Sequence, residues 1–360
     1  MNKKHDKAIS FKGQDFYIGI DVHKKQWTIV VISMNMRLGR SVTINPSAES
    51  LYKYLTKRYP GGNYYAVYEA GFSGFKAARD LNKLGIKCKV IHAADVPTSQ
   101  KERLNKNDRI DANKLARSLS NHELKGIYIP EKKAEEYRSL NRYRLQKRKD
   151  LTRIKNRIKS FLYYYGIQIP IELEGRRWSG AFIKWLSEQK FDTEYGQFAF
   201  NNFLEELIMT RKLISNTLKK MREMSRDTEP FAQLIPLLLT VPGIGFITAM
   251  TLATELIDIN RFKRLEHLAN YVGLVPSIQS TDDKEFISGI SRRRNKHLRS
   301  MLIEAAWKAI KIDEALTMKF NNLSSRMPRN KAIVRIAKIL LSRVRHVWKE
   351  QEPYVMGLVS

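Results

Sequence analysis

Four carboxylates occupy positions where an acidic side chain needs a compensating group. Asp21 lies inside an apolar, β-branched run at residues 17–33 (YIGIDVHKKQWTIVVIS), and Glu69 follows a second apolar run. An unpaired carboxylate in apolar surroundings is costly, so each of these two requires a partner. Asp108 and Asp111 are three residues apart, which places both on one face of a helix, where like charges repel.

A divalent cation would compensate these charges. Mg²⁺, with Mn²⁺ as the alternative ion, takes carboxylate oxygens and keeps some of its waters for a phosphate. Two such ions roughly 3.5–4 Å apart can activate a nucleophile and stabilise a leaving oxygen in phosphoryl transfer. We therefore predict a metal-dependent phosphoryl-transfer site whose ligands and catalytic residues are Asp21, Glu69, Asp108 and Asp111.

Each acid also has a structural interpretation. Asp21 fits a strand end or a turn, and Glu69 fits hydrogen bonds to the backbone amides of the segment EAGFSG. Asp108 fits a helix N-cap, and Asp111 fits a first helical turn, where the helix dipole favours negative charge. The order of the four acids on strand, strand and helix favours the metal site over four separate explanations.

The elements that must position these acids follow from the surrounding pattern. Strand-like apolar runs occur at residues 16–33 (two strands joined by the polar turn DVHKK), 63–70 and 86–93. Helical spacing occurs at residues 75–85, where Gly85 ends the helix, and from Asn107 or Asp108 to residue 119. This alternation predicts an α/β domain with a mixed sheet over residues 14–128.

A strongly basic helical region is predicted next, over residues 129–228. Two long helices, at residues 131–165 and 198–225, are expected to form an antiparallel hairpin or coiled coil. Between residues 142 and 159 there are nine Lys or Arg and one acid, Asp150. Charge of one sign favours nucleic-acid binding over an ordinary solvated face. The cations predicted to contact nucleic acid are Arg142, Arg144, Lys147, Arg148, Lys149, Arg153 and Lys155.

A mainly α-helical domain is predicted over residues 229–350. Its PGIG segment, residues 242–245, is either a turn whose amides approach a DNA phosphate or a tight turn packed in a core. The stretch at residues 276–300 is rich in hydroxyls and is followed by a basic cluster. It fits either a phosphate-directed nucleophile or a solvated loop before a phosphate-binding helix. The cations of this cluster predicted to bind nucleic acid are Arg292, Arg293, Arg294 and Lys296.

Composition limits the class of protein. In 360 residues, 65 Lys and Arg against 36 Asp and Glu give a net charge of +29, which favours a polyanionic partner. The single cysteine, Cys88, excludes an intrachain disulfide and a cysteine-based zinc site. The charged N-terminus lacks the apolar core of a signal peptide, and no apolar run is long enough for a bilayer. We expect a protein of the prokaryotic cytoplasm, associated with the nucleoid and not with a membrane.

Five segments, in order, resemble one known family. They are YIGIDVHKKQW, YEAGFSGF, KNDRIDANKLA, VPGIG and YVGLVPSIQSTDDKEFISGISRRRNKHLR. Together they resemble the DEDD transposases of the insertion-sequence-110 group, relatives of the Piv-type DNA invertases. The resemblance implies an N-terminal domain similar to the RuvC resolvase, with an RNase H-like α/β fold. It also maps the four acids of the family onto Asp21, Glu69, Asp108 and Asp111.

The same resemblance implies a catalytic serine shortly after the segment GLVP, which attacks DNA and forms a covalent phosphoserine link. The family usually has serine followed by glycine there, whereas this chain has Ser280, Thr281 and Asp282. An ungapped count favours Thr281, and a shift of one residue favours Ser280. We prefer Ser280 because its hydroxyl is less hindered, and keep Thr281 as the alternative; Ser277 and Ser288 are weaker candidates.

The resemblance implies partners too: donor and target DNA, a noncoding bridge RNA as guide, and assembly into dimers or tetramers through the long helices. The implied function is site-specific recombination for a mobile element, with a composite site because acids and serine lie in different domains. The alternative is a metal-dependent, structure-selective endonuclease such as a junction resolvase, which needs no nucleophilic hydroxyl. A third interpretation is a non-catalytic RNA- or DNA-binding protein, for which removal of any of the four acids would leave activity in the cell unchanged. A metal-independent serine recombinase would leave the four acids unexplained.

Overall fold

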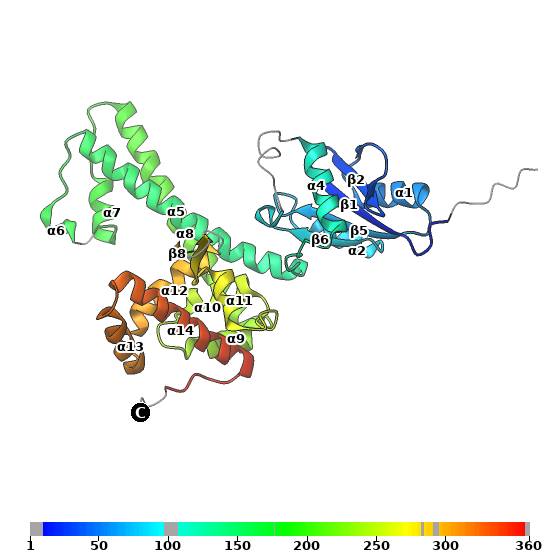
Figure 1. Ribbon diagram of the computed structural model, residues 1–360. Helices are drawn as coiled ribbons and strands as arrows, with labels where there is room; N and C mark the ends of the chain where they lie inside the picture. Colours follow the sequence, from blue (N-terminus) through cyan, green and yellow to red (C-terminus); the bar gives the residue numbers. More distant parts are fainter. Residues whose placement is uncertain (1–9, 97–106, 176, 282–283, 291–294, 357–360) are drawn as a thin grey trace, which may run out of the picture. The chain divides into compact units, whose positions relative to one another are not determined.

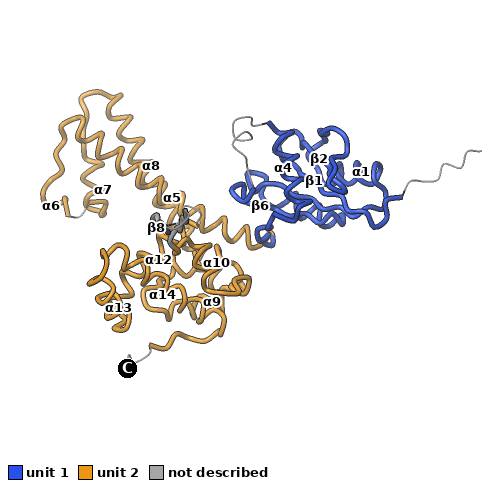
Figure 2. The backbone as a smooth tube through the Cα atoms, in the orientation of Figure 1, with its two compact units in different colours: residues 1–131 blue, residues 132–360 orange. Residues whose placement is uncertain are grey.

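The computed structural model describes residues 10–96, 107–175, 177–281, 284–290 and 295–356 (Figure 1). Side chains are not described for residues 276–290 or for Lys296. The chain forms two compact units, residues 1–131 and 132–360 (Figure 2), and each is described by itself. The predicted regions 129–228 and 229–350 therefore lie almost entirely in the second unit.

A mixed sheet forms the centre of the first unit, as predicted. The strand order is β3-β2-β1-β5-β6, with β4 also paired to β2. Strands β1 and β2 are antiparallel, whereas β1, β5 and β6 are parallel to one another. The strands are β1 (Asp15–Val22), β2 (Trp27–Ser33), β3 (Met36–Arg37), β4 (Val42–Ile44), β5 (Asn63–Glu69) and β6 (Lys87–Ile91).

Helices cover both faces of this sheet. Side chains of even-numbered β1 residues, Phe16, Ile18 and Ile20, pack into one core with helices α1 (Ala48–Arg58) and α2 (Lys76–Lys83). Helix α4 (Asp108–Ser120) packs on the opposite face, against β1, β2 and β5. Sheet and helices together are consistent with an RNase H-like α/β fold. A short 3₁₀ turn, η1 (Ala93–Asp95), follows β6.

Gly19 permits the close contact between β1 and α4. A Cβ atom at this position would lie 2.0 Å from the carbonyl oxygen of Ala112 and 2.5 Å from the amide nitrogen of Ala116. Real Cβ atoms do not approach backbone so closely, and both helix residues that face the strand are alanines with no exposed surface. Glycine on the strand and alanine on the helix therefore let α4 lie directly on the sheet.

Two long helices in the second unit run antiparallel, as predicted. Helix α5 (Lys132–Tyr164) packs along α8 (Glu194–Asp227), which begins four residues earlier than the predicted 198 (Figure 1). Phe161, near the end of α5, contacts Phe203, near the start of α8, so the two helices run in opposite directions. The connection holds two short helices, α6 (Ile171–Glu174) and α7 (Gly180–Ser187).

The described residues of the C-terminal part form helices and a β-hairpin. The hairpin, β7 (Pro276–Thr281) paired antiparallel to β8 (Lys284–Ile290), occupies the stretch interpreted from sequence as a loop or nucleophile segment. The helices around the common apolar core are α9 (Phe231–Leu239), α10 (Phe246–Leu256), α11 (Leu265–Val272), α12 (Lys296–Ala309), α13 (Glu314–Ser324) and α14 (Arg329–Glu350).

The PGIG segment is the packed turn between α9 and α10. Gly243 has φ +81°, and a Cβ there would lie 2.4 Å from the carbonyl oxygen of Ala305 on α12. Val241, Pro242 and Ile244 are buried beside it. Of the two interpretations of this motif, the structure supports the turn packed in a core.

Candidate active site

Asp21 and Glu69 lie at the same edge of the sheet. The parallel register between β1 and β5 pairs Gly19 with Val67, and its continuation by two residues places Asp21 beside Glu69. Side chains alternate between the two faces of a strand, so both acids share the face of Tyr17, which packs in the core beneath α4. The sheet therefore presents both carboxylates on the side that α4 covers.

Asp108 and Asp111 lie in the first turn of α4, above that face. The N-cap is Asn107, whose side chain accepts a hydrogen bond of 3.1 Å from the amide of Arg109. The N-cap interpretation of Asp108 is thus wrong, because its neighbour fills that role. Both carboxylates in a first turn are favoured by the helix dipole, but they also add negative charge near Asp21.

His23 completes a cluster that the sequence argument missed. Its Nε2 atom lies 3.2 Å from Oδ2 of Asp21 and 3.5 Å from Oδ2 of Asp108. Ligand atoms of all three residues lie within 4.8 Å of one another. The sequence spacing could have indicated His23, because a residue two positions after Asp21 projects to the same side of an extended chain.

The electrostatics of the cluster disfavour an ionised carboxylate at Asp21. Burial raises the pKa of Asp21, and the nearby carboxylates of Asp108 and Asp111 raise it further, while His23 opposes both. Asp111 is therefore close enough to act on Asp21 through its charge. A group whose charged form is destabilised by burial and by like charges gains strongly from a bound cation.

The residues present fit a divalent cation. Two carboxylates and an imidazole converge within ligand distance, and Asp111 adds negative charge to the same surroundings. Carboxylate oxygens suit Mg²⁺ and Mn²⁺, whereas imidazole is a ligand of the transition metals and not of Mg²⁺. Direct ligation by His23 would therefore favour Mn²⁺ over Mg²⁺.

A pocket of about 550 Å³ opens beside these acids. Asp108 and His23 line one part of it, and Lys24, Lys25 and Gln26 from the turn between β1 and β2 line another, together with Phe72. The ring of Phe72 is 66% exposed, which is unusual for a phenylalanine without a partner. Lysines beside a carboxylate cluster suit a phosphodiester, since they hold the phosphate while the acids hold a cation.

Family models match both halves of the chain. A model described as "Transposase" of the DEDD IS110 type matches residues 18–167, which include the whole acidic cluster. A second, described as "Transposase IS116/IS110/IS902 family", matches residues 235–321. The chain belongs to the IS110 family of DEDD transposases. It is therefore a DNA transposase, and the family implies use of a divalent metal.

Curated transposases are similar to this chain along most of their length. A "Putative transposase y4qE" of Sinorhizobium fredii is 28% identical over 82% of this chain and 72% of its own. A "Transposase for insertion sequence element IS1533" of Leptospira borgpetersenii is 26% identical over 81% and 84%. A third relative, the "Transposase for insertion sequence element IS1111A" of Coxiella burnetii, is 26% identical over 78% and 76%. These names support a transposase of an insertion sequence.

The predicted nucleophile lies in the second unit of the transposase. The backbone of Ser280 pairs with Glu285 and that of Thr281 with Lys284, so both lie at the end of β7. Their side chains lie outside the described part of the structure, as do Arg292, Arg293, Arg294 and the side chain of Lys296, the first residue of α12. Their predicted roles therefore stay predictions.

Two of the cations predicted to bind nucleic acid have contacts or burial within the second unit that charge alone did not indicate. Arg142 makes a bidentate pair with the buried Glu255, with distances of 2.7 and 2.8 Å. Arg144 is only 7% exposed, because its position on α5 faces the interior of the unit. The burial of Arg144 argues against a contact with nucleic acid, whereas the Arg142 side chain is 46% exposed, so its predicted contact stays a prediction.

The remaining cations of α5 are accessible to different degrees. Lys147 and Arg153 both contact Asp150 at 3.0 Å. Lys155 lies 5.0 Å from the ring of Trp178, and burial lowers the pKa of its ammonium group. Arg148 and Lys149 are exposed.

Among the described residues, no helix is both long and apolar enough to cross a membrane.

Proposed function

We propose that this transposase cuts and joins DNA strands at a metal-dependent site formed by Asp21, Glu69, Asp108 and Asp111. The convergence of Asp21, His23 and Asp108 within ligand distance carries the proposal. When bound, a divalent cation would polarise the scissile phosphate and stabilise the leaving oxygen. Lys24 and Lys25, beside the acids, are suited to hold the phosphodiester in the adjacent pocket.

We further propose that Ser280, with Thr281 as the alternative, is the nucleophile. Its hydroxyl oxygen forms the new bond to phosphorus, the bond from phosphorus to one deoxyribose oxygen breaks, and the hydroxyl proton ends on that oxygen. The phosphoserine link stores the energy of the broken ester for rejoining to a second strand. The position of Ser280 and Thr281 at the end of β7, in a strand pair that immediately precedes the basic cluster, supports this role.

Covalent attachment tests the nucleophile directly. Purified protein is incubated with radiolabelled DNA that carries the element ends, and denaturing gels separate free from protein-linked DNA. We expect Ser280→Ala to abolish the adduct while Thr281→Val retains it, or the reverse if Thr281 is the nucleophile. Cleavage without any adduct in the wild-type protein would favour the second candidate, a structure-selective endonuclease, whose acids and pocket lie within the first unit alone.

A guide RNA and an oligomer complete the proposal. The net charge of +29 supports a large polyanionic partner, and strand exchange requires two DNA ends held together. Sequencing the nucleic acid that copurifies with the protein, expressed together with the DNA that flanks its gene, tests the RNA. One discrete noncoding RNA from that flank is expected, whereas random fragments alone would contradict RNA guidance.

A further inference from the structure

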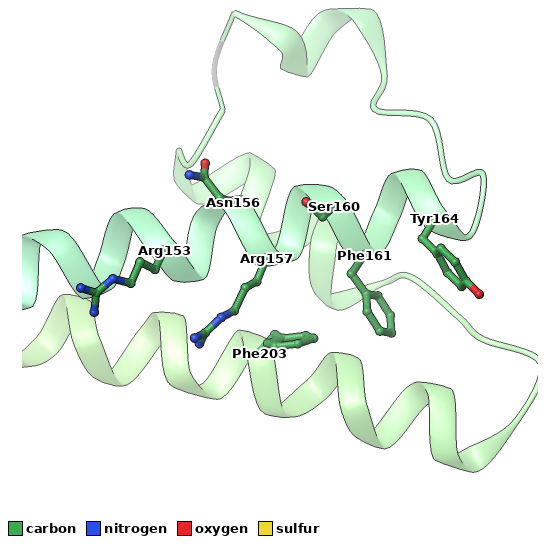
Figure 3. Close-up of a pocket in the computed structure, with 7 residues that line it drawn as sticks. All are labelled: Arg153, Asn156, Arg157, Ser160, Phe161, Tyr164 and Phe203. Atoms are coloured by element: carbon green, nitrogen blue, oxygen red, sulfur yellow. The ribbon is translucent and has the colours of Figure 1, made fainter.

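An open groove on the helical pair has the residues of a nucleotide-binding surface. Its volume is about 620 Å³, and it lies on one stripe of α5 with a contribution from α8 (Figure 3). The residues on α5 recur every three or four positions, so they share one side of the helix. The lining consists of Arg153, Asn156, Arg157, Ser160, Phe161 and Tyr164 of α5, and Phe203 of α8.

Two aromatic rings form the floor of this groove. The centroids of Phe161 and Phe203 lie 5.5 Å apart with an angle of 69° between the rings, so the rings meet nearly at right angles. Phe161 also stacks on Phe200 at 5.7 Å, and Phe200 is completely buried between the two helices. The rings are therefore held in place by the core of the pair, which lowers the cost of ordering them on binding.

Tyr164 adds a third ring at the end of the groove. Its side chain is 84% exposed, far more than a tyrosine needs for solvating its hydroxyl. Aromatic side chains placed along a basic surface are the feature by which proteins stack unpaired bases. Tyr163 is 69% exposed but does not line the groove, so it offers a matched comparison.

Two guanidinium groups lead toward these rings. Arg157 lies about one helical turn before Phe161, and Arg153 about one turn before Arg157, which spaces them by roughly 6 Å along the helix. Arg157 faces Glu206 at 3.6 Å with both side chains about half exposed, and Arg153 shares Asp150 with Lys147. Such exposed ion pairs contribute little to stability. Either guanidinium group can therefore exchange its carboxylate partner for a phosphate at a small cost in free energy.

We propose that this groove binds unpaired nucleotides of a nucleic-acid strand. The base stacks on the aromatic floor, the phosphates lie along Arg157 and Arg153, and Asn156 and Ser160 on the opposite rim of α5 supply hydrogen-bonding groups for sugar or base (Figure 3). The strand is single because a duplex keeps its base faces stacked inside. The inference rests on the proposed function, since it names the form of nucleic acid that the basic helix holds.

A second copy of the chain fits the groove less well. A protein segment packed against the rings would have to bury Arg157, Asn156 and Ser160 without a phosphate to pair with the charge. A nucleic-acid strand has phosphates for the guanidinium groups and bases for the aromatic rings of the lining.

The test compares two neighbouring tyrosines in the full-length protein. Fluorescein-labelled oligouridine and oligodeoxyuridine of equal length are titrated in buffer with EDTA, and binding is read as fluorescence anisotropy. We expect Tyr164→Ala to weaken binding about tenfold and Tyr163→Ala to change it less than about twofold. Tighter binding of the ribose or of the deoxyribose probe would identify RNA or DNA as the strand. Equal losses for both variants, or equal losses with a duplex probe, would overturn the proposal.

Two further readouts separate stacking from charge and from assembly. Arg157→Gln should weaken binding about fivefold at low salt and much less at high salt, whereas the Tyr164→Ala loss should persist. A probe with one 5-iodouracil should photocrosslink to Phe161, Tyr164 or Phe203. Conversion of an oligomer to monomer by Tyr164→Ala would overturn the proposal in favour of a second copy. EDTA removes the cation, so these results are independent of whether the acidic site cuts DNA.

Discussion

At the scale of single residues, an aspartate in an apolar strand has a physical reason. Asp21 lies at the end of β1, on the face covered by α4, where His23 and Asp108 meet it. Burial and two neighbouring carboxylates raise its pKa, so the residue costs stability in the absence of a cation. The same charges that destabilise the cation-free site favour the binding of a cation.

Replacing this carboxylate should separate stability from activity. We expect Asp21→Asn to reduce DNA cleavage by about 10³-fold or more, because it removes a metal ligand. The same change should leave the melting temperature in EDTA unchanged or slightly higher, since it relieves repulsion with Asp108 and Asp111. Cleavage of end-containing plasmid and thermal unfolding provide the two measurements. Asp80→Asn, on α2, is the control and should retain activity; a large drop in melting temperature for Asp21→Asn would contradict this account.

His23 should act on the metal and not on DNA affinity. If its imidazole contacts the cation, His23→Ala should raise the metal concentration for half-maximal cleavage by about 10-fold or more, with Mn²⁺ affected more than Mg²⁺. DNA affinity measured in EDTA should stay within about twofold. An unchanged metal dependence would show that His23 only holds Asp21 in position.

At the scale of elements, close contact between a strand and a helix determines where the acids meet. Strands 16–33, 63–70 and 86–93 and the helix over Asp108 and Asp111 were predicted from apolar periodicity, which local sequence carries well. The contribution of Gly19 could not be predicted, because its contact with Ala112 joins segments more than 90 residues apart. The β7–β8 hairpin was missed since hydroxyls and charges dominate its sequence. The pairing of Arg142 was missed because its partner, Glu255, lies 113 residues further along the chain.

Gly19→Ala should displace α4 from the sheet. The added methyl would overlap the backbone of Ala112 and Ala116, so we expect a loss of about 1–3 kcal/mol in the free energy of unfolding of the first unit. DNA cleavage should fall further than the smaller folded fraction alone would explain, because Asp108 moves with α4 away from Asp21. Urea titration and the cleavage assay give the two values. Gly126→Ala, where the Cβ meets only the Lys89 side chain at 3.5 Å, should be neutral for both.

The PGIG turn offers an internal comparison. Gly243→Ala would force alanine into φ +81° against the carbonyl oxygen of Ala305, and should destabilise the second unit by about 2 kcal/mol or more. Gly245→Ala has open space around its Cβ and should leave the stability unchanged. If instead both variants kept their stability and lost DNA affinity equally, the turn would act as a phosphate contact.

At the scale of the whole molecule, a surplus of positive charge coexists with a buried carboxylate of the second unit, that of Glu255. Glu255 on α10 is fully buried; it pairs with Arg142 of α5 and accepts a hydrogen bond of 2.9 Å from Asn295, the N-cap of α12. Burial opposes its ionisation, but the hydrogen bonds from Arg142 and Asn295 outweigh this and lower the pKa of Glu255. The carboxylate thus joins three elements, one of which directly follows the segment with the predicted nucleophile.

The buried pair of Glu255 and Arg142 predicts that the second unit loses stability at acid pH. Since the folded pKa of Glu255 lies below its unfolded value, its ionised form contributes stability above about pH 4.3, and this is lost as the pH falls through the folded value. Urea titrations between about pH 7 and pH 3 should show falling stability for the wild type. Glu255→Gln should be about 3 kcal/mol less stable at pH 7 and should vary less with pH. Glu223→Gln, at an exposed pair, should match the wild type; an identical pH profile for Glu255→Gln would refute the assignment.

The central claim is that Asp21, His23 and Asp108 hold a divalent cation for DNA strand transfer. Anomalous diffraction from crystals of the protein soaked in Mn²⁺ tests it most directly. We predict a peak within coordination distance, roughly 2.0–2.3 Å, of carboxylate oxygens of Asp21 and Asp108, and its absence in Asp21→Asn crystals treated identically. A metal-dependent transposase whose Mn²⁺ binds elsewhere, with no peak between these two aspartates, would contradict the account.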